Sequence, residues 1–255
     1  MTTVNDIFEN LNELAPVSLK MDFDNVGLLV GNGKNTVKKC LIALDITNEV
    51  IDEAISVGAE LIVSHHPIIF EAQKTVLEDD IVGGKLVKLI RNGISAVCMH
   101  TNLDIAQGGV NDALMAVLGC KAEEALDYDG CGRTGEYATP IEFEVFLNMC
   151  KESLNTKGLR YYYAGTPVKK LAVMGGSGGG CVALAKEKGC DTYVTADVKY
   201  NQFLDAKELG INLIDADHFC TENVIVPVLY ERLSCAFSDV EFKISKVHHQ
   251  TVCFM

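Results

Sequence analysis

The stretch that decides the fold is residues 37–63, VKKCLIALDITNEVIDEAISVGAELIV. Its first part, residues 37–46, is apolar enough to predict a buried strand. Residues 49–57 carry apolar side chains at helical spacing and stop before Gly58, which is typical of a helix and its end. Residues 60–63 then predict a second strand. A strand, a helix and another strand in succession indicate a β-α-β unit and therefore a parallel or mixed sheet.

The same alternation continues through most of the chain. We expect helices at residues 81–91, 109–118, 141–155, 180–188, 200–209 and 221–233, and strands at 95–99, 169–173, 192–195, 212–215 and within the tail 241–255. A turn-rich segment at residues 127–135 interrupts the order and is a plausible domain boundary.

These elements predict an α/β protein of two interlinked α/β domains. Each domain should hold a mostly parallel or mixed sheet covered by helices. We place the N-terminal domain at residues 1–126 and the second domain at residues 127–235. The tail at 236–255 is a candidate to return to the first domain.

Composition excludes several classes of function. The chain has 255 residues, 48% of them hydrophobic, and a net charge of −13. So acidic a surface argues against binding to nucleic acid or to an anionic membrane. No apolar run is long enough for a membrane span. The N-terminus lacks the basic start and apolar run of a secretory signal, so we expect a cytoplasmic protein.

The ten cysteines contain no C-x-x-C pair. In a long chain expected in a reducing compartment, they are best interpreted as scattered free thiols, several of them buried. This interpretation removes a four-thiolate zinc site from consideration.

Four of the six histidines follow predicted strands. His65 and His66 come directly after the strand at 60–63, and His100 follows the strand at 95–99 with Asp104 four residues later. Adjacent side chains on an extended chain point in opposite directions. The pair His65–His66 therefore suits two metal ions, or one ion reached after a turn. Two hydrogen-bonded polar residues at a strand end are an equally good interpretation of this pair alone.

His218 and Glu222 lie four residues apart where a strand ends and a helix begins. On one helix face they would offer an imidazole and a carboxylate, a set suited to Zn, Fe or Mn. A capped helix start with Glu in its first turn is the alternative. Taken with the other histidines, Asp104 or Glu222 could bridge two ions about 3.5–4 Å apart, as in two-metal hydrolytic sites.

These motifs resemble the dinuclear metal-centre family known as type-2 GTP cyclohydrolase I homologues, over essentially the whole chain. The resemblance rests on FDNVGLLVG (23–31), SHHPIIF (64–70), HTNLD (100–104), GRTGE (132–136), TADVKY (195–200) and DHFCTE (217–222). The histidine pair at a strand end, combined with the later His-x-x-x-Glu, is quite specific.

The resemblance implies a two-domain α/β subunit in a homohexameric ring, with two divalent ions per subunit (Zn, Fe or Mn) and a small-molecule substrate. Carried over by motif, the metal ligands are His65, His66, Asp104, His218 and Glu222. His100 would be a catalytic residue that transfers a proton, or would lie just behind the ligands.

The chain departs from the family pattern at four positions, none of which removes a ligand. Phe23 stands where the family usually has Trp, and Asp217 where it usually has Gly before the metal histidine. Asp217 adds negative charge beside the metals. Ala196 replaces a usual Gly, and Asn201 replaces a frequent His, which changes the chemistry of the pocket.

Three functions compete. The first is a metal-dependent hydrolase acting on a nucleotide-like or other small substrate, with water activated by the metal pair. The second is a non-enzymatic, metal-stabilised ring that serves as a scaffold or regulator. The third is dinucleotide binding by the glycine-rich loop at 174–180, which loosely fits G-x-G-x-x-A. A tight turn that lets a helix pack closely on a strand explains this loop better.

Overall fold

The computed structural model describes residues 1–255 and divides them into two compact units. Unit 1 consists of Met1–Ala106 and Val226–His249, and unit 2 of Gln107–Ile225 and Gln250–Met255. The sequence pattern placed the boundaries at 126 and 235 instead. The helix α5 (Val110–Val117) belongs with unit 2 because it packs on that unit's strands β5 and β7.

Unit 1 is built on a five-stranded mixed sheet in the order β1-β4-β3-β2-β10. β2, β3, β4 and β10 run parallel, and β1 is antiparallel to β4. The strands are β1 (Gly27–Val30), β2 (Lys39–Ala43), β3 (Leu61–Ser64), β4 (Ser95–Cys98) and β10 (Glu241–Ile244). β10 pairs directly with β2, so the tail of the chain completes this sheet.

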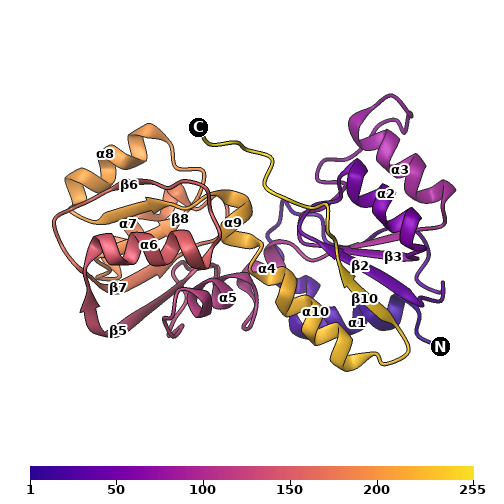
Figure 1. The fold of residues 1–255 in the computed structure, drawn as a ribbon, viewed down its shortest axis with the longest axis horizontal. Helices are drawn as coiled ribbons and strands as arrows, with labels where there is room; N and C mark the ends of the chain where they lie inside the picture. The colour runs from indigo at the N-terminus through magenta and orange to yellow at the C-terminus, as the bar shows by residue number, and fades with distance from the viewer. The chain divides into compact units, whose positions relative to one another are not determined.

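Helices cover both faces of this sheet. α2 (Asn48–Val57) and α3 (Ile81–Arg91) pack on one face, over alternate strand residues such as Leu41 and Ile62. The intervening residues point to the opposite face, which α1 (Val4–Leu14) and α10 (Ile225–Ala236) cover in Figure 1. Alternate packing of this kind buries all of β3 and most of β2.

Unit 2 repeats the plan with a sheet in the order β5-β7-β8-β9-β6. β7, β8 and β9 are parallel, and the edge strands β5 and β6 are antiparallel to their neighbours. The strands are β5 (Arg133–Ile141), β6 (Arg160–Tyr162), β7 (Val168–Val173), β8 (Thr192–Thr195) and β9 (Asn212–Asp215).

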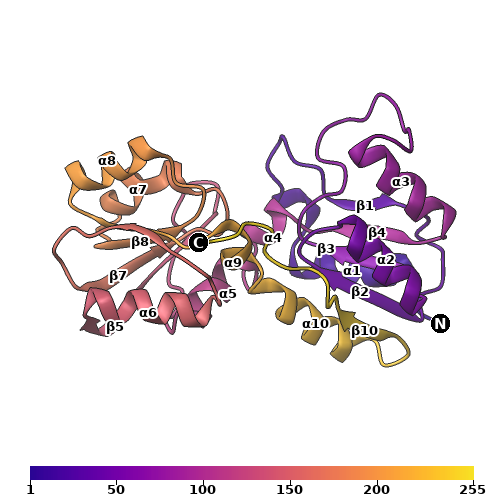
Figure 2. The same ribbon diagram turned by 45° about the horizontal axis from the view of Figure 1, so that its top comes forward.

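Its helices also lie in two layers. α5 and α6 (Phe143–Ser153) share a buried apolar cluster with β7, β8 and β9. α7 (Val182–Glu187) and α8 (Tyr200–Leu209) lie on the other side of the sheet, as the rotated view in Figure 2 shows. The predicted fold class, two helix-covered α/β sheets, is therefore confirmed.

The strands β1 and β6 and the short helix at Thr101–Ile105 were not expected, and three further local features differ from the expectation. The helix predicted at 221–233 is two helices, α9 (His218–Glu222) and α10, with a break at Asn223. The turn-rich segment at 127–135 already contains the start of β5. α1 was not predicted, although Thr3 caps it by accepting a hydrogen bond from the Asp6 amide.

Two global expectations agree with the structure. All ten cysteines are free thiols. None of the helices combines the length and the apolar character that crossing a membrane requires.

Candidate metal centre

In unit 1, polar side chains gather where three parallel strands end. Ala43, Ser64 and Cys98 are aligned across β2, β3 and β4. The residues that follow these positions therefore emerge at one edge of the sheet, where open α/β sheets place their functional groups. Asp45 follows β2, His65 and His66 follow β3, and His100 follows β4.

His65 is fully buried and its orientation is fixed by the backbone. Its Nδ1 lies 2.8 Å from the Met99 carbonyl oxygen. Because a carbonyl can only accept, Nδ1 must carry the proton, which leaves the lone pair on Nε2. That Nε2 lies 3.6 Å from Oδ1 of Asp104 in the short helix α4 (Thr101–Ile105). The imidazole thus presents its coordinating atom beside a carboxylate.

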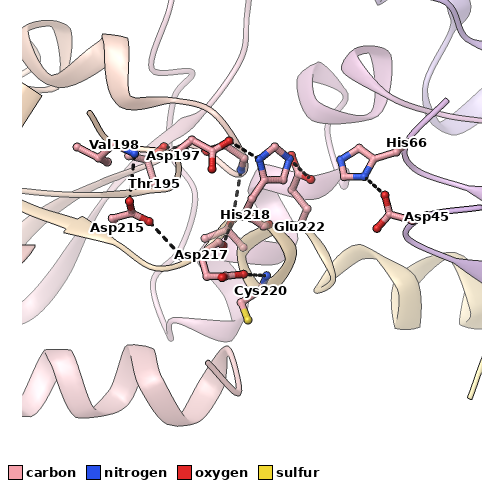
Figure 3. Close-up of polar contacts among 12 residues, drawn as sticks. Asp45, His66, Thr195, Asp197, Val198, Asp215, Asp217, His218, Cys220 and Glu222 are labelled. Atoms are coloured by element: carbon pink, nitrogen blue, oxygen red, sulfur yellow. Dashed lines mark hydrogen bonds and ion pairs between the residues drawn. The ribbon is translucent and has the colours of Figure 1, made fainter. Parts of the chain in front are cut away.

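His66 is held in the same way by an acid. Its Nδ1 donates to Oδ1 of Asp45 over 2.7 Å, a contact drawn in Figure 3. The His66 amide also donates to the Leu44 carbonyl at 2.9 Å, which ties the end of β3 to the end of β2. A carboxylate on one ring nitrogen fixes the tautomer and makes the other nitrogen a better metal ligand.

His100 is hydrogen-bonded to the buried carboxylate of Asp24. Its Nδ1 donates to Asp24 Oδ1 over 2.8 Å, while the Thr101 amide and hydroxyl donate to Oδ2 at 3.0 and 2.5 Å. Burial by itself would raise the pKa of Asp24. The hydrogen bonds from His100 and Thr101 outweigh it and hold that pKa well below the ordinary value. Asp24 is therefore an ionised, fully used acceptor.

We call His65, His66, Asp104 and His100 the unit 1 ligand group, in which the first three are the predicted ligands and His100 is the predicted proton-transfer residue. The three imidazoles bring ligand nitrogens within 4.8 Å of one another, close enough to hold a metal ion. Imidazole nitrogens with a carboxylate oxygen form a borderline donor set, which fits Zn, Fe or Mn better than Ca or Mg. The residues present therefore fit the kind of ion that the sequence predicts.

Unit 2 gathers its polar residues at the corresponding edge of its own sheet. Val173, Val194 and Ile214 are aligned across β7, β8 and β9, so Gly176, Asp197 and His218 follow three adjacent strands. His218 opens α9 and Glu222 closes it, which puts both on one side of a single helical turn. His218 and Glu222 form the unit 2 ligand group.

His218 lies between two carboxylates. Its Nδ1 is 2.7 Å from Asp197 Oδ2 and its Nε2 is 3.0 Å from Glu222 Oε2 (Figure 3). Burial acts to lower the pKa of His218, but the hydrogen bonds and charges of Glu222 and Asp197 raise it to about 9. A metal ion at Nε2 would therefore have to displace a proton.

The glycine-rich loop after β7 makes room for this group. Gly176 has φ +64°, and a methyl group on it would lie 2.1 Å from Glu222 Oε1 and 3.2 Å from His218 Nε2. The Gly176 amide donates to Thr221 Oγ1 at 3.1 Å, and the Gly175 amide to Asn111 Oδ1 at 2.9 Å. Both amides donate to side chains of this protein and not outward to a ligand, which favours the tight-turn interpretation over a phosphate-binding loop.

Two strained residues flank His218. Of the three non-glycine residues with positive φ, Asp197 (+52°) bonds His218 and Asp217 (+75°) directly precedes it. The Asp217 carboxylate accepts from the Cys220 amide at 3.1 Å, as a helix cap does, and also from the Gln250 side-chain amide. Left-handed φ at non-glycine residues is costly and clusters at functional sites.

The structure thus places the predicted site residues in two groups, four on unit 1 and two on unit 2. The predicted role of each ligand stays a prediction. Sequence reasoning missed that three acids orient the imidazoles, namely Asp24, Asp45 and Asp197. Asp197 carried a usable signal, since it follows the predicted strand at 192–195 as the histidines follow theirs. Asp45 lies inside the predicted strand at 37–46, and only the end of β2 at Ala43 shows that it follows a strand.

Comparison with known proteins identifies the family to which this chain is similar. A family model described as Duf34/NIF3 (NGG1p interacting factor 3) matches residues 2–251. A Clostridium perfringens (strain 13 / Type A) protein named GTP cyclohydrolase 1 type 2 homolog is 41% identical over 256 residues, covering 95% of this chain and 96% of that protein.

Two further relatives agree. A Helicobacter pylori (strain J99 / ATCC 700824) protein named GTP cyclohydrolase 1 type 2 is 33% identical over 237 residues, covering 91% of this chain and 92% of that protein. The crystal structure of a Bacillus cereus protein related to NIF3 matches with a TM-score of 0.93 at 26% identity, over 100% of this chain and 99% of that one. The chain therefore belongs to the Duf34/NIF3 family, as a GTP cyclohydrolase 1 type 2 homologue.

Proposed function

We propose that this chain is a metal-dependent hydrolase in which two divalent ions are held by His65, His66, Asp104, His218 and Glu222. The substrate class is a nucleotide-like or other small molecule, in keeping with the name of the Helicobacter relative.

The observation that carries the proposal is shared by all four histidines at the strand ends. Each directs Nδ1 to an oxygen of a neighbouring residue: the Met99 carbonyl or the carboxylates of Asp45, Asp24 and Asp197. This is the usual arrangement behind metal-binding histidines, because it fixes the ring and leaves Nε2 to coordinate. The tail histidines His248 and His249 direct Nδ1 to carbonyls two or three residues away, whereas the partners of these four lie 21 to 76 residues away. Local helix capping or strand termination does not explain such distant partners.

Bound divalent ions would lower the pKa of a coordinated water and so supply hydroxide at neutral pH. The chain itself would contribute positioning and proton transfer. His100, whose Nδ1 is held by Asp24, offers Nε2 as the atom that takes up or returns a proton. Asp24 keeps this ring in one orientation throughout.

Metal analysis tests the proposal directly. We expect about two metal equivalents per chain after purification and dialysis, and a clear loss in His66→Ala and in His218→Ala. His249→Ala, which removes an exposed histidine outside both groups, is the matched control and should keep its metal. Less than one equivalent in the unaltered protein would overturn the dinuclear proposal.

Activity is tested separately. A hydrolysis screen of nucleotides, run with and without a chelator, should give turnover that chelation abolishes and that added Zn, Fe or Mn restores. Full metal content without any turnover would favour the scaffold or regulatory role instead. Assembly into a homohexameric ring is a further part of the proposal, and sedimentation velocity of the purified protein measures it.

A further inference from the structure

Two phenylalanine rings of unit 1 face water although both are large and apolar. Phe23 is 64% exposed and Phe70 is 49% exposed. Their ring centroids are 6.3 Å apart at an interplanar angle of 67°, an edge-to-face pair. Exposed aromatic rings in contact with one another commonly mark a binding site, because leaving them in water is unfavourable.

Hydrogen bonds hold the two segments that carry these rings. Next to Phe23, Asp24 is buried and bonded to His100 and Thr101, and its carbonyl accepts from Lys20 Nζ at 2.9 Å. Asn25 Nδ2 donates to the Ile69 carbonyl at 2.6 Å, which ties this segment to the one bearing Phe70. The two rings are therefore presented by fixed backbone on both sides.

The pair is continuous with the unit 1 ligand group. The Phe70 ring lies 6.0 Å from the His100 ring at 85°, and the His100 ring lies 5.2 Å from that of His65 and 5.6 Å from that of His66. A series of touching rings thus leads from the solvent to the imidazoles. A ligand resting on the phenylalanines would reach His100 with its neighbouring atoms.

We propose that Phe23 and Phe70 form a stacking subsite for an uncharged planar heteroaromatic ring, such as a nucleobase, of the small molecule on which this protein acts. The inference rests on the proposed function and narrows its substrate class. Asp22 and Glu71, which flank the two rings along the chain, disfavour an anionic group at this position. A protein partner seated on both rings would also cover His100, whereas one planar ring leaves His100 to the rest of the substrate.

The test is a titration by saturation-transfer NMR, with guanosine as the aromatic probe and ribose as its matched non-aromatic probe. Guanosine should bind and ribose should not. Phe23→Ala and Phe70→Ala should each weaken guanosine binding about tenfold, whereas Phe23→Trp should keep it. Tyr128→Ala, which removes a 94% exposed aromatic ring from unit 2, is the control and should bind like the unaltered protein.

Equal binding of ribose, or unchanged guanosine binding in both alanine variants, would overturn the subsite. A change of oligomeric state in Phe23→Ala without a change in guanosine affinity would also overturn it and assign the rings to an interface between copies. Metal analysis of the same preparation separates the two proposals. Less than one metal equivalent per chain before any chelator is added, with ring-dependent guanosine binding intact, would reject the dinuclear hydrolase and keep the subsite.

Discussion

The two ligand groups lie at corresponding edges of two different sheets, and they differ in the backbone that carries them. The unit 1 group takes its donors from residues just beyond strands, and its imidazoles are oriented by hydrogen bonds to Met99, Asp45 and Asp24. The unit 2 group sits on one helical turn, beside a glycine and two aspartates with positive φ. Both groups orient their imidazoles by hydrogen bonds, but the unit 2 group depends in addition on backbone conformations that most residues avoid.

This difference indicates which substitutions should disrupt each ligand group. Removing a hydrogen-bond acceptor should destabilise unit 1, because a buried donor left without its partner is desolvated with no hydrogen bond in compensation. In unit 2, the sensitive positions should be those where a side chain would collide or where the backbone is strained. The predictions below separate these two modes.

The largest effect is expected at Asp24. Asp24→Asn should destabilise the protein by about 3 kcal/mol, because a buried acceptor of four hydrogen bonds is replaced by a weaker one. Urea unfolding at pH 7 measures this, with the exposed Asp22→Asn as the control. The pKa of Asp24 is lowered in the folded protein, so its stabilisation is complete above about 3.8 and is lost as the pH falls towards the folded pKa. A gap between the two proteins that grows on acidification would contradict this account.

Gly176→Ala should come next, at about 2 kcal/mol, with loss of metal from the unit 2 group. The added methyl group would collide with Glu222 and would also strain a left-handed backbone. Gly165→Ala is the matched control, because Gly165 has φ +85° with open space around it, and should cost only about 1 kcal/mol. Equal losses in the two variants would show that contact with Glu222 is unimportant.

Exchanging the orienting acids compares the groups through metal binding. Asp45→Asn and Asp197→Asn should each lower metal affinity about tenfold, as measured by competition with a chromogenic chelator. Asparagine tolerates left-handed φ as well as aspartate does, so the change at Asp197 removes charge without adding strain. Unchanged affinity in both variants would mean that these acids only pack against the rings.

The smallest effect is expected at Asp217. Asp217→Gly should change stability by less than about 0.5 kcal/mol, because relief of a strained φ offsets the lost helix cap. Asp217→Ala removes the cap and keeps the strain, and should cost about 1 kcal/mol more. Thermal unfolding of the pair distinguishes them. A glycine variant as unstable as the alanine variant would remove strain from the account of unit 2.

The regular parts of the fold could be predicted because they depend on local patterns. The helix ending at Gly58 and the strand leading into His65 follow from spacing and from one left-handed cap. The break at Asn223 was predictable from Pro227, because proline is tolerated only in the first turn of a helix and so requires α10 to begin shortly before it. α1 was predictable from its capping residue Thr3 and its apolar spacing.

The site was predictable only in part. The positions of the histidines after strands indicated metal chemistry. The family resemblance then indicated which residues would be metal ligands and which would transfer a proton. The pairing of His100 with Asp24 spans 76 residues and depends on how a loop folds back, which no short-range pattern encodes. The need for Gly176 likewise appears only once Glu222 is placed beside it.

The pairing of β10 with β2 has a consequence for synthesis on the ribosome. Gln107–Ile225, nearly all of unit 2, is translated before Glu241–Ile244 emerges. Until then β2 is an open edge, and open strand edges invite pairing with other chains. The nascent chain therefore carries a nearly complete second unit while its first unit still lacks one strand, a stage at which the open edge of β2 favours misassembly.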